Sequence, residues 1–462
     1  MKTKNIITAL LLLCLSTSCE KWFDVTPKTE MKASVLFSTE AGFRDALIGI
    51  YAAMAQKSLY GTDLTLAYSD VLAQTYDNVK SNASHVYKNS VVFKYTELDE
   101  TARIENIWKQ MYKAIAEANI ILANIDDNKD VFKENNFNIV KGEALGLRAL
   151  IHFDLLRLFA PSPVTGLDKK AIPYVDQFSN VAFPQLTLDQ TFLKIVSDIN
   201  AARSLLKDAD PWGPKYASFN QAALPTFLKL RNNRLNYYAV TGLLARVLLY
   251  KGDKTNALVA AREVIDSGIF PLYQNSSFIS ENLFAISKPD TKSAIVDVFF
   301  PKVTDVYNYS FLTIKTTNYT AIYTNGVDQD YRLNWFESLN STDTRIKKYD
   351  NIANIPVLKV SEMYLIAAES ELNTKVAFSS YLNILKAYRG LSPIDPNSTA
   401  TILSTEINKE YRKEFVAEGQ LFFYYKRLYV NKLPTITAFA SNEAVYNLPI
   451  PVSEKEFGNY SN

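Results

Sequence analysis

The amino-acid sequence predicts a mainly α-helical protein in which helix pairs form a scaffold and a loop-rich face carries a few short strands. Three observations favour this fold class. Apolar residues recur at helical spacing along several long segments. Glycine is scarce, at 14 of 462 residues, which disfavours a fold with many tight turns between strands. Apolar residues make up 48% and charged residues 21% of the chain, as in soluble globular proteins.

The N-terminus has the pattern of an export signal. The basic segment MKTKN precedes the apolar run IITALLLLCL, which is too short to span a bilayer but suits a signal peptide. Small polar residues then lead to Cys19, in an arrangement that resembles the lipobox of bacterial lipoproteins. We expect residues 1–18 to be a lipoprotein signal peptide, Cys19 to be lipidated, and residues 19–35 to form the lipidated N-terminus and tether. The alternative is an ordinary signal peptide with a chance cysteine.

Processing at this site would change both the charge and the thiol content. Lys2, Lys4 and Cys14 would leave with residues 1–18, so basic and acidic residues would balance and no disulfide could form. A neutral chain lacks the basic footprint that nucleic-acid binding needs, and we expect no nucleic acid among the partners. No later apolar segment is long and uncharged enough to span a membrane, so the lipid anchor would supply the membrane contact.

The remainder, residues 36–462, is predicted to be one α-helical domain. Its first four helices are indicated by apolar residues at i, i+3, i+4 and i+7. They cover residues 43–54, 104–125 and 142–159 and a segment that begins after Thr187, where Thr187 and Gln190 have the spacing of a capping box.

Two later segments each contain two helical patterns around a short turn. They lie near residues 236–268 and 357–390, and the first has the length of a tetratricopeptide helix pair. Gly242 and Ala257 are small residues where paired helices would approach closely, and Gly268 is a candidate for the residue that ends the second helix. Recurring helix pairs favour a superhelical, tetratricopeptide-like scaffold.

Two long segments, residues 56–103 and 270–356, lack helical spacing. They are rich in Asn, Asp, Ser, Thr and Tyr, and their aromatic content argues against disorder. The second segment contains two candidate strands, at residues 294–300 and 311–323. We expect both segments to be loop-rich insertions that form a ligand-binding face opposite the helix pairs.

The sequence offers little for catalysis. No HExxH, CxxC, GxSxG, GxGxxG or phosphate-loop pattern occurs, and His152, among apolar neighbours in a helix, is expected to be a core residue. Glu410, Glu414 and Glu418 share one helix face. Paired acids could serve glycoside hydrolysis, but salt bridges with basic neighbours are the favoured interpretation. The acidic run at residues 126–130 lacks the glycine and glutamate of a calcium loop. We expect no enzyme activity, no cofactor and no metal site.

The two polar segments do supply recognition chemistry. Aromatic rings stack on the apolar faces of sugars, while Asn, Asp and Arg side chains form hydrogen bonds with hydroxyl groups. Each tyrosine alone is explained by packing, but their clustering predicts a chemically inert binding site. The candidate ligand-binding residues are Tyr76, Asp77 and Asn78 from the first segment and Tyr309, Tyr331 and Trp335 from the second.

Six segments, in order and over nearly the whole chain, resemble the SusD/RagB family of outer-membrane lipoproteins of Bacteroidetes. They are KWFDVTP after the anchor, the early helices IWKQMYKAIAEANIILANI and GEALGLRALIHFDLLRLF, then VLKVSEMYLIAAESE, KEYRKEFVAEGQLFFYYKR and the closing YNLPIPVSEKEF. The chain departs from the family pattern at four positions. Tyr411, Leu421 and Lys359 stand where arginine is usual, and Tyr424 stands where aspartate is usual. These departures indicate altered internal ion pairing.

The resemblance implies a binding protein that is lipid-anchored in the outer membrane and faces the exterior. It would capture an oligosaccharide, or in some members a peptide, and deliver it to a SusC-like TonB-dependent transporter on which the tetratricopeptide-like helices would pack. The family's ligand residues lie in variable loops, so none is carried over to this sequence. One alternative is a tetratricopeptide-type scaffold that binds only protein, and a weaker one is a glycoside hydrolase.

Overall fold

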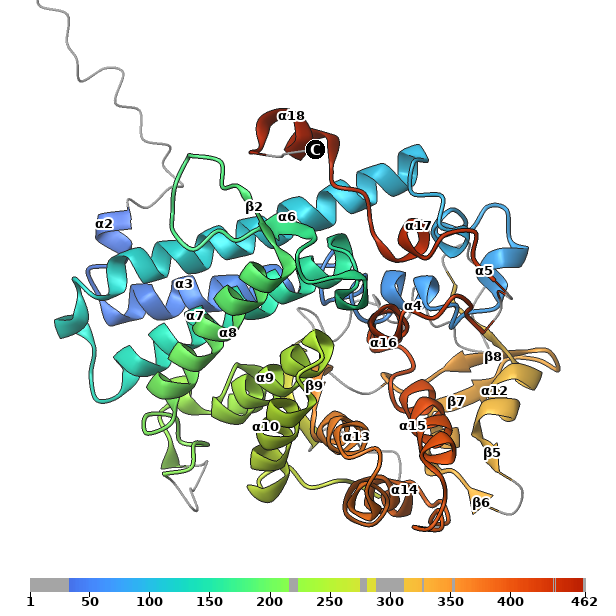
Figure 1. The fold of residues 1–462 in the computed structure, drawn as a ribbon. Coiled ribbons are helices and arrows are strands. Elements are labelled where there is room, and N and C mark those ends of the chain that lie inside the picture. The colour runs from blue at the N-terminus through green and yellow to red at the C-terminus, as the bar shows by residue number, and fades with distance from the viewer. Residues whose placement is uncertain are drawn as a thin grey trace, which may run out of the picture.

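The structure of the protein is a computed structural model that describes residues 33–215, 223–274, 281–287, 311–325, 328–350, 354–434, 436 and 438–459. Helices dominate it, which confirms the predicted fold class (Figure 1). The buried apolar residues of these parts join in one continuous core. Within the described ranges, no helix is both long enough and apolar enough to cross a membrane.

The N-terminal part is a stack of long helices. α3 (Glu40–Met54), α6 (Leu98–Ile125), α7 (Asn136–Phe159) and α8 (Leu188–Leu206) confirm the four helices predicted from apolar spacing, and the short α2 (Ala33–Leu36) precedes them. Thr187 and Gln190 form the predicted capping box of α8. α7 is buried along most of its length because α3, α6 and α8 pack around it. A side chain on Gly142 would lie 2.8 Å from Leu206, so the glycine allows α7 and α8 to approach closely.

The two predicted helix pairs are present. α9 (Tyr237–Lys251) and α10 (Lys254–Asp266) form the first, while α13 (Val360–Ser370), a π-helical segment η10 (Ala377–Leu382) and α14 (Asn383–Tyr388) form the second. α10 packs on α13, so the pairs continue the stack that begins with α7, α8 and α9 (Figure 1). Gly252 and Gly268 follow α9 and α10 with φ values of 99° and 64°, in the left-handed region that favours glycine. Gly242 allows close approach to Leu283 and Met363, and not to α10 as the sequence suggested.

The described strands are short and antiparallel. β1 (Lys170–Pro173) pairs with β2 (Gln185–Thr187), β3 (Asn282–Ser287) with β9 (Asn354–Lys359), and β5 (Thr324–Asn325) with β6 (Asp328–Gln329), while β8 (Asp343–Ile346) lies between β4 (Ile314–Lys315) and β7 (Phe336–Ser338).

The strand predicted over residues 311–323 is wrong beyond β4. Residues 316–323 form the helix α12 (Thr316–Tyr323). Two contacts explain the difference: the Thr320 hydroxyl donates to the Thr316 carbonyl one turn earlier, and Tyr319 and Tyr323, also one turn apart, both pack on Phe336. The strand predicted at residues 294–300 lies outside the described residues.

Residues 56–103 are rich in turns, as their composition predicts, but much of this segment is buried and does not form an exposed face. They form short helices, α4 (Tyr68–Leu72), α5 (Asn78–Ser81) and η2 (Ser90–Val92), and residues 59–74 are all buried. The Tyr87 hydroxyl donates to Asp63 over 2.9 Å, and the Gln74 amide donates to the Val91 carbonyl over 2.8 Å. Internal hydrogen bonds of this kind allow a polar sequence to be buried.

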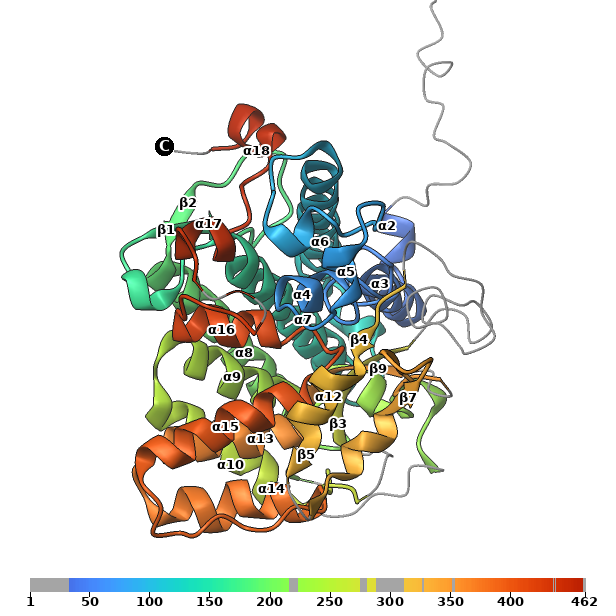
Figure 2. The same cartoon turned by 90° about the vertical axis from the view of Figure 1, so that its right-hand side faces the viewer.

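The C-terminal part packs back on the N-terminal half. α15 (Ala400–Glu414), α16 (Leu421–Leu428), α17 (Asn442–Tyr446) and α18 (Val452–Phe457) complete the described chain. The Lys426 ammonium group, between α7 and α17, donates to the carbonyls of Arg157 and Tyr446 over 2.8 Å each. Figure 2 shows α4, α12, α15 and α16 on one face of the molecule. The remaining described single turns are η3 (Lys129–Val131), η4 (Pro163–Thr165), η6 (Thr226–Leu228), η7 (Arg231–Asn233) and η9 (Tyr331–Trp335).

His152 is a core residue, as the sequence predicts. Its Nδ1–H donates to the Arg148 carbonyl over 2.9 Å, and its Nε2 accepts a hydrogen bond from the Val175 amide over 3.0 Å. The ring stacks on Tyr174 with centroids 3.9 Å apart. Burial lowers the pKa of His152 to about 3, because a second proton would be buried without an acceptor. The histidine therefore stays neutral in the folded protein.

This histidine predicts a pH dependence of stability. The unfolded chain takes up a proton on His152 below about pH 6.5, whereas the folded chain does not until about pH 3. The free energy of unfolding should therefore fall as the pH falls from 6.5, by up to ~1.4 kcal/mol per pH unit from this group. Chemical denaturation of wild type and His152→Gln between pH 7 and pH 5 measures it. The variant should be less stable at pH 7 but show a flatter slope, and equal slopes would contradict the assignment.

Candidate ligand-binding site

The site begins where the two predicted polar segments meet. The Asp77 carboxylate accepts hydrogen bonds from the Lys315 backbone amide and the Asn318 side chain, each over 2.7 Å. The Asn78 side chain donates to the Phe311 carbonyl over 2.7 Å and accepts from the Thr313 amide over 2.9 Å. Asp77 and Asn78 therefore join the start of α5 to β4 and α12.

Beside this junction lies a cavity of about 380 Å³. Its walls come from the turn before α5, from α12, and from the facing sides of α15 and α16, which Figure 2 shows on one face of the molecule. The cavity is lined by Ala73, Gln74, Thr75, Asp77, Ile314, Asn318, Tyr319, Ala321, Ile322, Tyr323, Lys409, Arg412, Val416, Leu421, Tyr425 and Pro434.

The wall combines aromatic rings with hydrogen-bonding groups. Tyr319 is half-buried, and its ring stacks on Phe336 with centroids 5.1 Å apart. Burial raises the pKa of Tyr425 to about 12, so its hydroxyl keeps its proton at neutral pH. Asn318 is exposed and Arg412 half-buried on opposite walls. Among the described residues, Asp77 is the only carboxylate of the wall.

The loop after α15, residues 415–419, contributes Val416 to the cavity wall. Ala417 and Gly419 have φ values of 56° and 69°, and a side chain on Gly419 would lie 2.1 Å from the Leu64 carbonyl oxygen. The buried Asp70 carboxylate accepts hydrogen bonds from both backbone amides. Asp70 thereby holds the loop in a conformation that its alanine disfavours.

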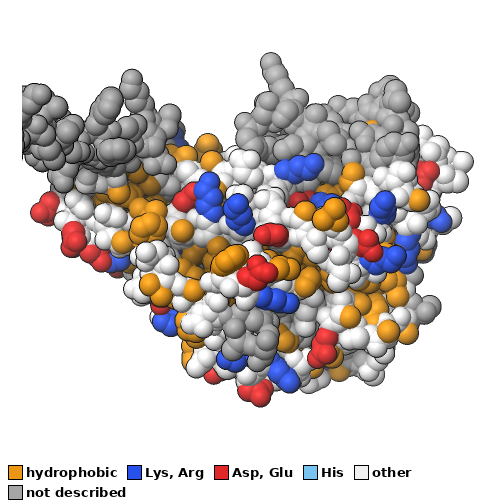
Figure 3. Space-filling model, turned by 90° about the horizontal axis from the view of Figure 1, so that it is seen from above, with side chains coloured by type: hydrophobic (Ala, Val, Ile, Leu, Met, Phe, Trp, Pro, Cys, Tyr) orange, Lys and Arg blue, Asp and Glu red, His pale blue; other side chains and the backbone are white. Residues whose placement is uncertain are grey.

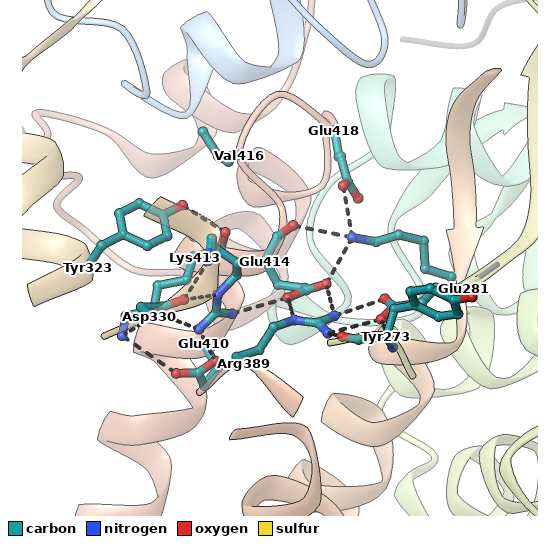
Figure 4. Close-up of polar contacts among 12 residues, drawn as sticks. Tyr273, Glu281, Tyr323, Asp330, Arg389, Glu410, Lys413, Glu414, Val416 and Glu418 are labelled. Atoms are coloured by element: carbon teal, nitrogen blue, oxygen red, sulfur yellow. Dashed lines mark hydrogen bonds and ion pairs between the residues drawn. The ribbon is translucent and has the colours of Figure 1, made fainter. Parts of the chain in front are cut away.

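Behind this loop lies a buried network of ion pairs (Figure 4). One Glu414 oxygen contacts Arg389 at 2.8 Å and Lys359 at 3.1 Å, and the other contacts Arg389 at 3.0 Å and Arg332 at 3.1 Å. Arg389 also binds Glu281 through both of its Nη atoms, at 2.8 and 2.9 Å. The glutamate therefore has three positively charged partners from three other parts of the chain.

The other two glutamates belong to the same network, but Glu418 lies in the loop after α15, so the prediction that all three share one helix face is wrong for Glu418. Glu410 contacts Arg332 at 2.8 Å, and Glu418 binds Lys359 at 2.8 Å and also Lys348. The favoured interpretation of these glutamates as salt-bridge partners is confirmed. Burial alone would raise the pKa of Glu414, but the charges of Arg389 and Lys359 outweigh it and hold that pKa well below its usual range. A carboxyl group in this state cannot serve as a general acid at neutral pH.

Only some of the predicted ligand-binding residues lie at the cavity. Asp77 lines the cavity, and Asn78 builds the junction beside it. Tyr76 and Trp335 are each only 2% exposed; the Tyr76 hydroxyl donates to the Leu66 carbonyl, and Trp335 packs under the Lys348 ammonium group at 4.0 Å. Their rings present no face to a ligand, which corrects the expectation for these two.

The remaining two predicted residues are Tyr331 and Tyr309. Tyr331 is half-buried at the start of η9, where its backbone amide donates to the Arg389 carbonyl, and it is not part of the cavity wall. Tyr309 lies outside the described residues. The prediction missed Arg412 on α15 and Tyr425 on α16. Only the position of Arg412 next to the glutamate face of α15 pointed toward this region.

A second hollow, of about 480 Å³, lies between α6, the segment before β2, and α18. Trp108, Tyr112, Phe183 and Phe457 line it, and apolar side chains gather on this face when it is seen from above (Figure 3). None of the predicted ligand-binding residues contributes to its wall. We therefore take the cavity beside Asp77, which joins both polar segments, as the candidate site. Among the residues that the structure describes, no group of three His, Cys, Asp or Glu side chains is placed to hold a metal ion.

Comparisons with known proteins identify related chains. A family described as "Starch-binding associating with outer membrane" matches residues 21–230, and one described as "SusD family" matches residues 273–458. Two SusD-like proteins of Formosa agariphila are 27% identical over 168 residues and 26% identical over 266 residues. These regions cover 35% and 57% of this chain but only 31% and 46% of the two relatives. The chain thus matches less than half the length of either relative.

Solved structures share the fold. A SusD-like carbohydrate-binding protein from Bacteroides vulgatus has a TM-score of 0.72 at 18% identity, over 91% of this chain and 97% of that one. A SusD superfamily protein from Bacteroides thetaiotaomicron has a TM-score of 0.70 at 21% identity, over 90% of this chain and 98% of that one. At such identities the likeness shows the fold, and the matched families cover most of the sequence. The chain belongs to the SusD/RagB family.

Proposed function

We propose that this protein is a cell-surface lipoprotein that binds an oligosaccharide or peptide nutrient and delivers it to a SusC-like TonB-dependent outer-membrane transporter. The observation that carries the proposal is the cavity beside Asp77, whose wall combines tyrosine rings with amide and cationic groups. Such a mixture of apolar faces and a few polar groups is typical of small-ligand sites. A carbohydrate-binding description of a protein with the same fold supports the oligosaccharide class.

The cavity favours binding without catalysis. Glycoside hydrolysis needs two carboxyl groups on either side of the scissile bond. Asp77 is the only acid in the described wall, and both of its oxygens already accept hydrogen bonds from Lys315 and Asn318. Glu414 and Glu418, the acids considered from the sequence, are buried among cations. The glycoside-hydrolase alternative therefore lacks its reacting groups in the described part of the chain.

The helix pairs offer a surface for the transporter. A groove of about 420 Å³ runs between α8, α9 and α10, and Val196, Leu244 and Leu248 contribute to its wall. Leu193 and Val259 also line it and are 59% and 63% exposed. Exposed apolar side chains that frame a groove are typical of protein interfaces. A scaffold that binds only protein would use the same groove, but it would leave the cavity beside Asp77 without a role.

Cys19 is the proposed attachment point for lipid. Acylated cysteine would hold the protein at the outer membrane, because each buried methylene of an acyl chain contributes ~0.8 kcal/mol and several chains together give stable anchoring. α2 lies at the periphery in both ribbon views (Figures 1 and 2). A tether that precedes it can therefore reach the membrane without passing through the core. We place the binding domain on the exterior side of that membrane.

Removal of the accessible tyrosine ring tests the binding site. Tyr319→Ala should weaken the binding of a ligand found by isothermal titration of a glycan and peptide panel by about tenfold, because a buried contact face is lost. Tyr388→Ala, which removes an exposed ring on α14 outside the cavity, is the matched control. No binding by the wild type across the panel would contradict the proposal, and would favour the scaffold alternative.

Charge placed in the groove tests the transporter contact. Leu193→Asp combined with Val259→Asp should reduce the recovery of the transporter in pull-downs from native outer membranes by about tenfold or more, because carboxylates would be buried at the interface. Val452→Asp with Phe457→Asp makes the same change on α18 and should leave recovery unchanged. The reverse result would move the docking surface to the α18 face, against the proposed placement.

Glu414→Gln separates a structural from a catalytic glutamate. The variant should lose about 3–5 kcal/mol of unfolding free energy, since Arg332, Arg389 and Lys359 lose a shared buried carboxylate. Chemical denaturation measures the loss, with the exposed Glu456→Gln as a control that should change stability by less than ~0.5 kcal/mol. Glycosidase turnover in the wild type that disappears in a folded Glu414→Gln protein would instead support the hydrolase alternative.

A further inference from the structure

Arg412 is distinguished from every other arginine of the chain. Among the residues that the structure describes, each of the other thirteen arginines has a carboxylate oxygen within 4 Å, and Arg412 has none. Arginine side chains are almost never fully buried unless they are paired. Arg412 is half-buried in the wall of the cavity beside Asp77. Within the described part of the chain, its guanidinium group is thus the cation of this cavity wall that has no carboxylate partner.

In the described part of the chain, the carboxylates of the cavity wall and of the neighbouring turn of α15 already have other partners. Lys409, one turn earlier on α15, and Val416, in the loop after α15, also line the cavity. Lys409 binds Glu406 at 2.6 Å. Asp77, on the opposite wall, is engaged by Lys315 and Asn318. Burial raises the pKa of Tyr425, and the nearby charge of Arg412 opposes part of that rise. Both residues line the cavity.

We infer that the cavity takes an anionic oligosaccharide, with the Arg412 guanidinium group binding a carboxylate or sulfate of the sugar. The inference rests on the proposed function and names its substrate class. Guanidinium presents paired N–H donors in a planar fork that matches the two oxygens of such a group. The ring of Tyr319 and the amide of Asn318 would contact the neutral part of the sugar. These two groups favour a saccharide over an acidic peptide as the source of the anion.

A role in folding does not account for Arg412. A long cationic side chain can also lie along apolar surface with its head in water. The neighbouring Lys413, by contrast, is buried and contacts Asp330 at 3.2 Å. Lys413 has two carboxylate partners, Asp330 and Glu410, whereas Arg412 has none among the described residues, so a carboxylate that pairs with Arg412 has to come from outside them. A ligand in the cavity is in position to supply it.

Charge-matched pairs of probes test the inference by isothermal titration. Oligogalacturonate is compared with its methyl ester, and a sulfated carrageenan oligosaccharide with its desulfated form, on the full processed chain. One acidic member should bind at least about tenfold more tightly than its neutral partner, and high ionic strength should reduce the difference. A preference in the first pair assigns a carboxylate, and one in the second pair a sulfate.

Substitutions assign the preference to Arg412. Arg412→Gln should lower the affinity for the acidic probe about tenfold, to the level of its neutral partner, and leave the neutral probe unchanged. Arg412→Lys should retain part of the preference, because it keeps the charge but not the fork. Arg262→Gln makes the same change at an exposed position of α10 and should leave the affinity for both probes unchanged.

Three results would overturn the inference. Equal affinity for acidic and neutral probes would show that charge is not recognised, and an equal loss for both in Arg412→Gln would show a general packing role. Either leaves the proposed binding function intact. Binding of a poly-glutamate peptide but of no glycan would replace the saccharide by a peptide. The absence of binding to every probe and peptide would contradict the proposed function itself.

Discussion

The carboxylate of Glu414 is the point on which the C-terminal half of the structure depends. It neutralises Arg332 from η9, Lys359 from the end of β9 and Arg389 from the end of α14, while Glu414 itself ends α15. Removing so many charges from water is costly, and it is tolerated only when every charge is paired and hydrogen-bonded. The network therefore forms as a unit, and these four elements can be buried only in one mutual arrangement.

This constraint explains why a binding cavity can be built from distant segments. α15 is fixed by the network on its inner face, and the loop that follows is held by Asp70, a residue more than three hundred positions earlier in the chain. The same loop carries Val416 into the cavity wall. Asp77 and Asn78 fix the opposite wall through β4 and α12. A wall held at both ends by hydrogen-bonded polar groups is formed before a ligand arrives, which lowers the entropic cost of binding.

The helices could be predicted from the sequence because their apolar spacing reports directly on burial, as in α3, α6 and α8. The burial of residues 59–74 could not be predicted, since their apolar residues follow no regular helical or strand spacing and hydrogen bonds to remote partners hold Asp70 and Gln74 in the core. Tyr76 and Trp335 show the same limit for the site: an aromatic ring in a polar segment predicts either a ligand platform or a core contact, and only packing decides. Tyr411 and Tyr424 stand where the family pattern has charged residues, and in this structure their rings stack with centroids 4.1 Å apart.

α15 shows how one helix can serve the fold and the ligand separately. Glu410, Lys413 and Glu414 are three and four residues apart, face inward and neutralise the buried cluster. Lys409 and Arg412, each one residue before Glu410 and Lys413, face the cavity instead, and so does Val416 in the loop that follows the helix. The charge of the cavity can therefore change without disturbing the network, because no inward residue contacts the Arg412 guanidinium group in the described chain. A fold stabilised on one face of this helix thus leaves the other face free to determine which ligand charge is accepted.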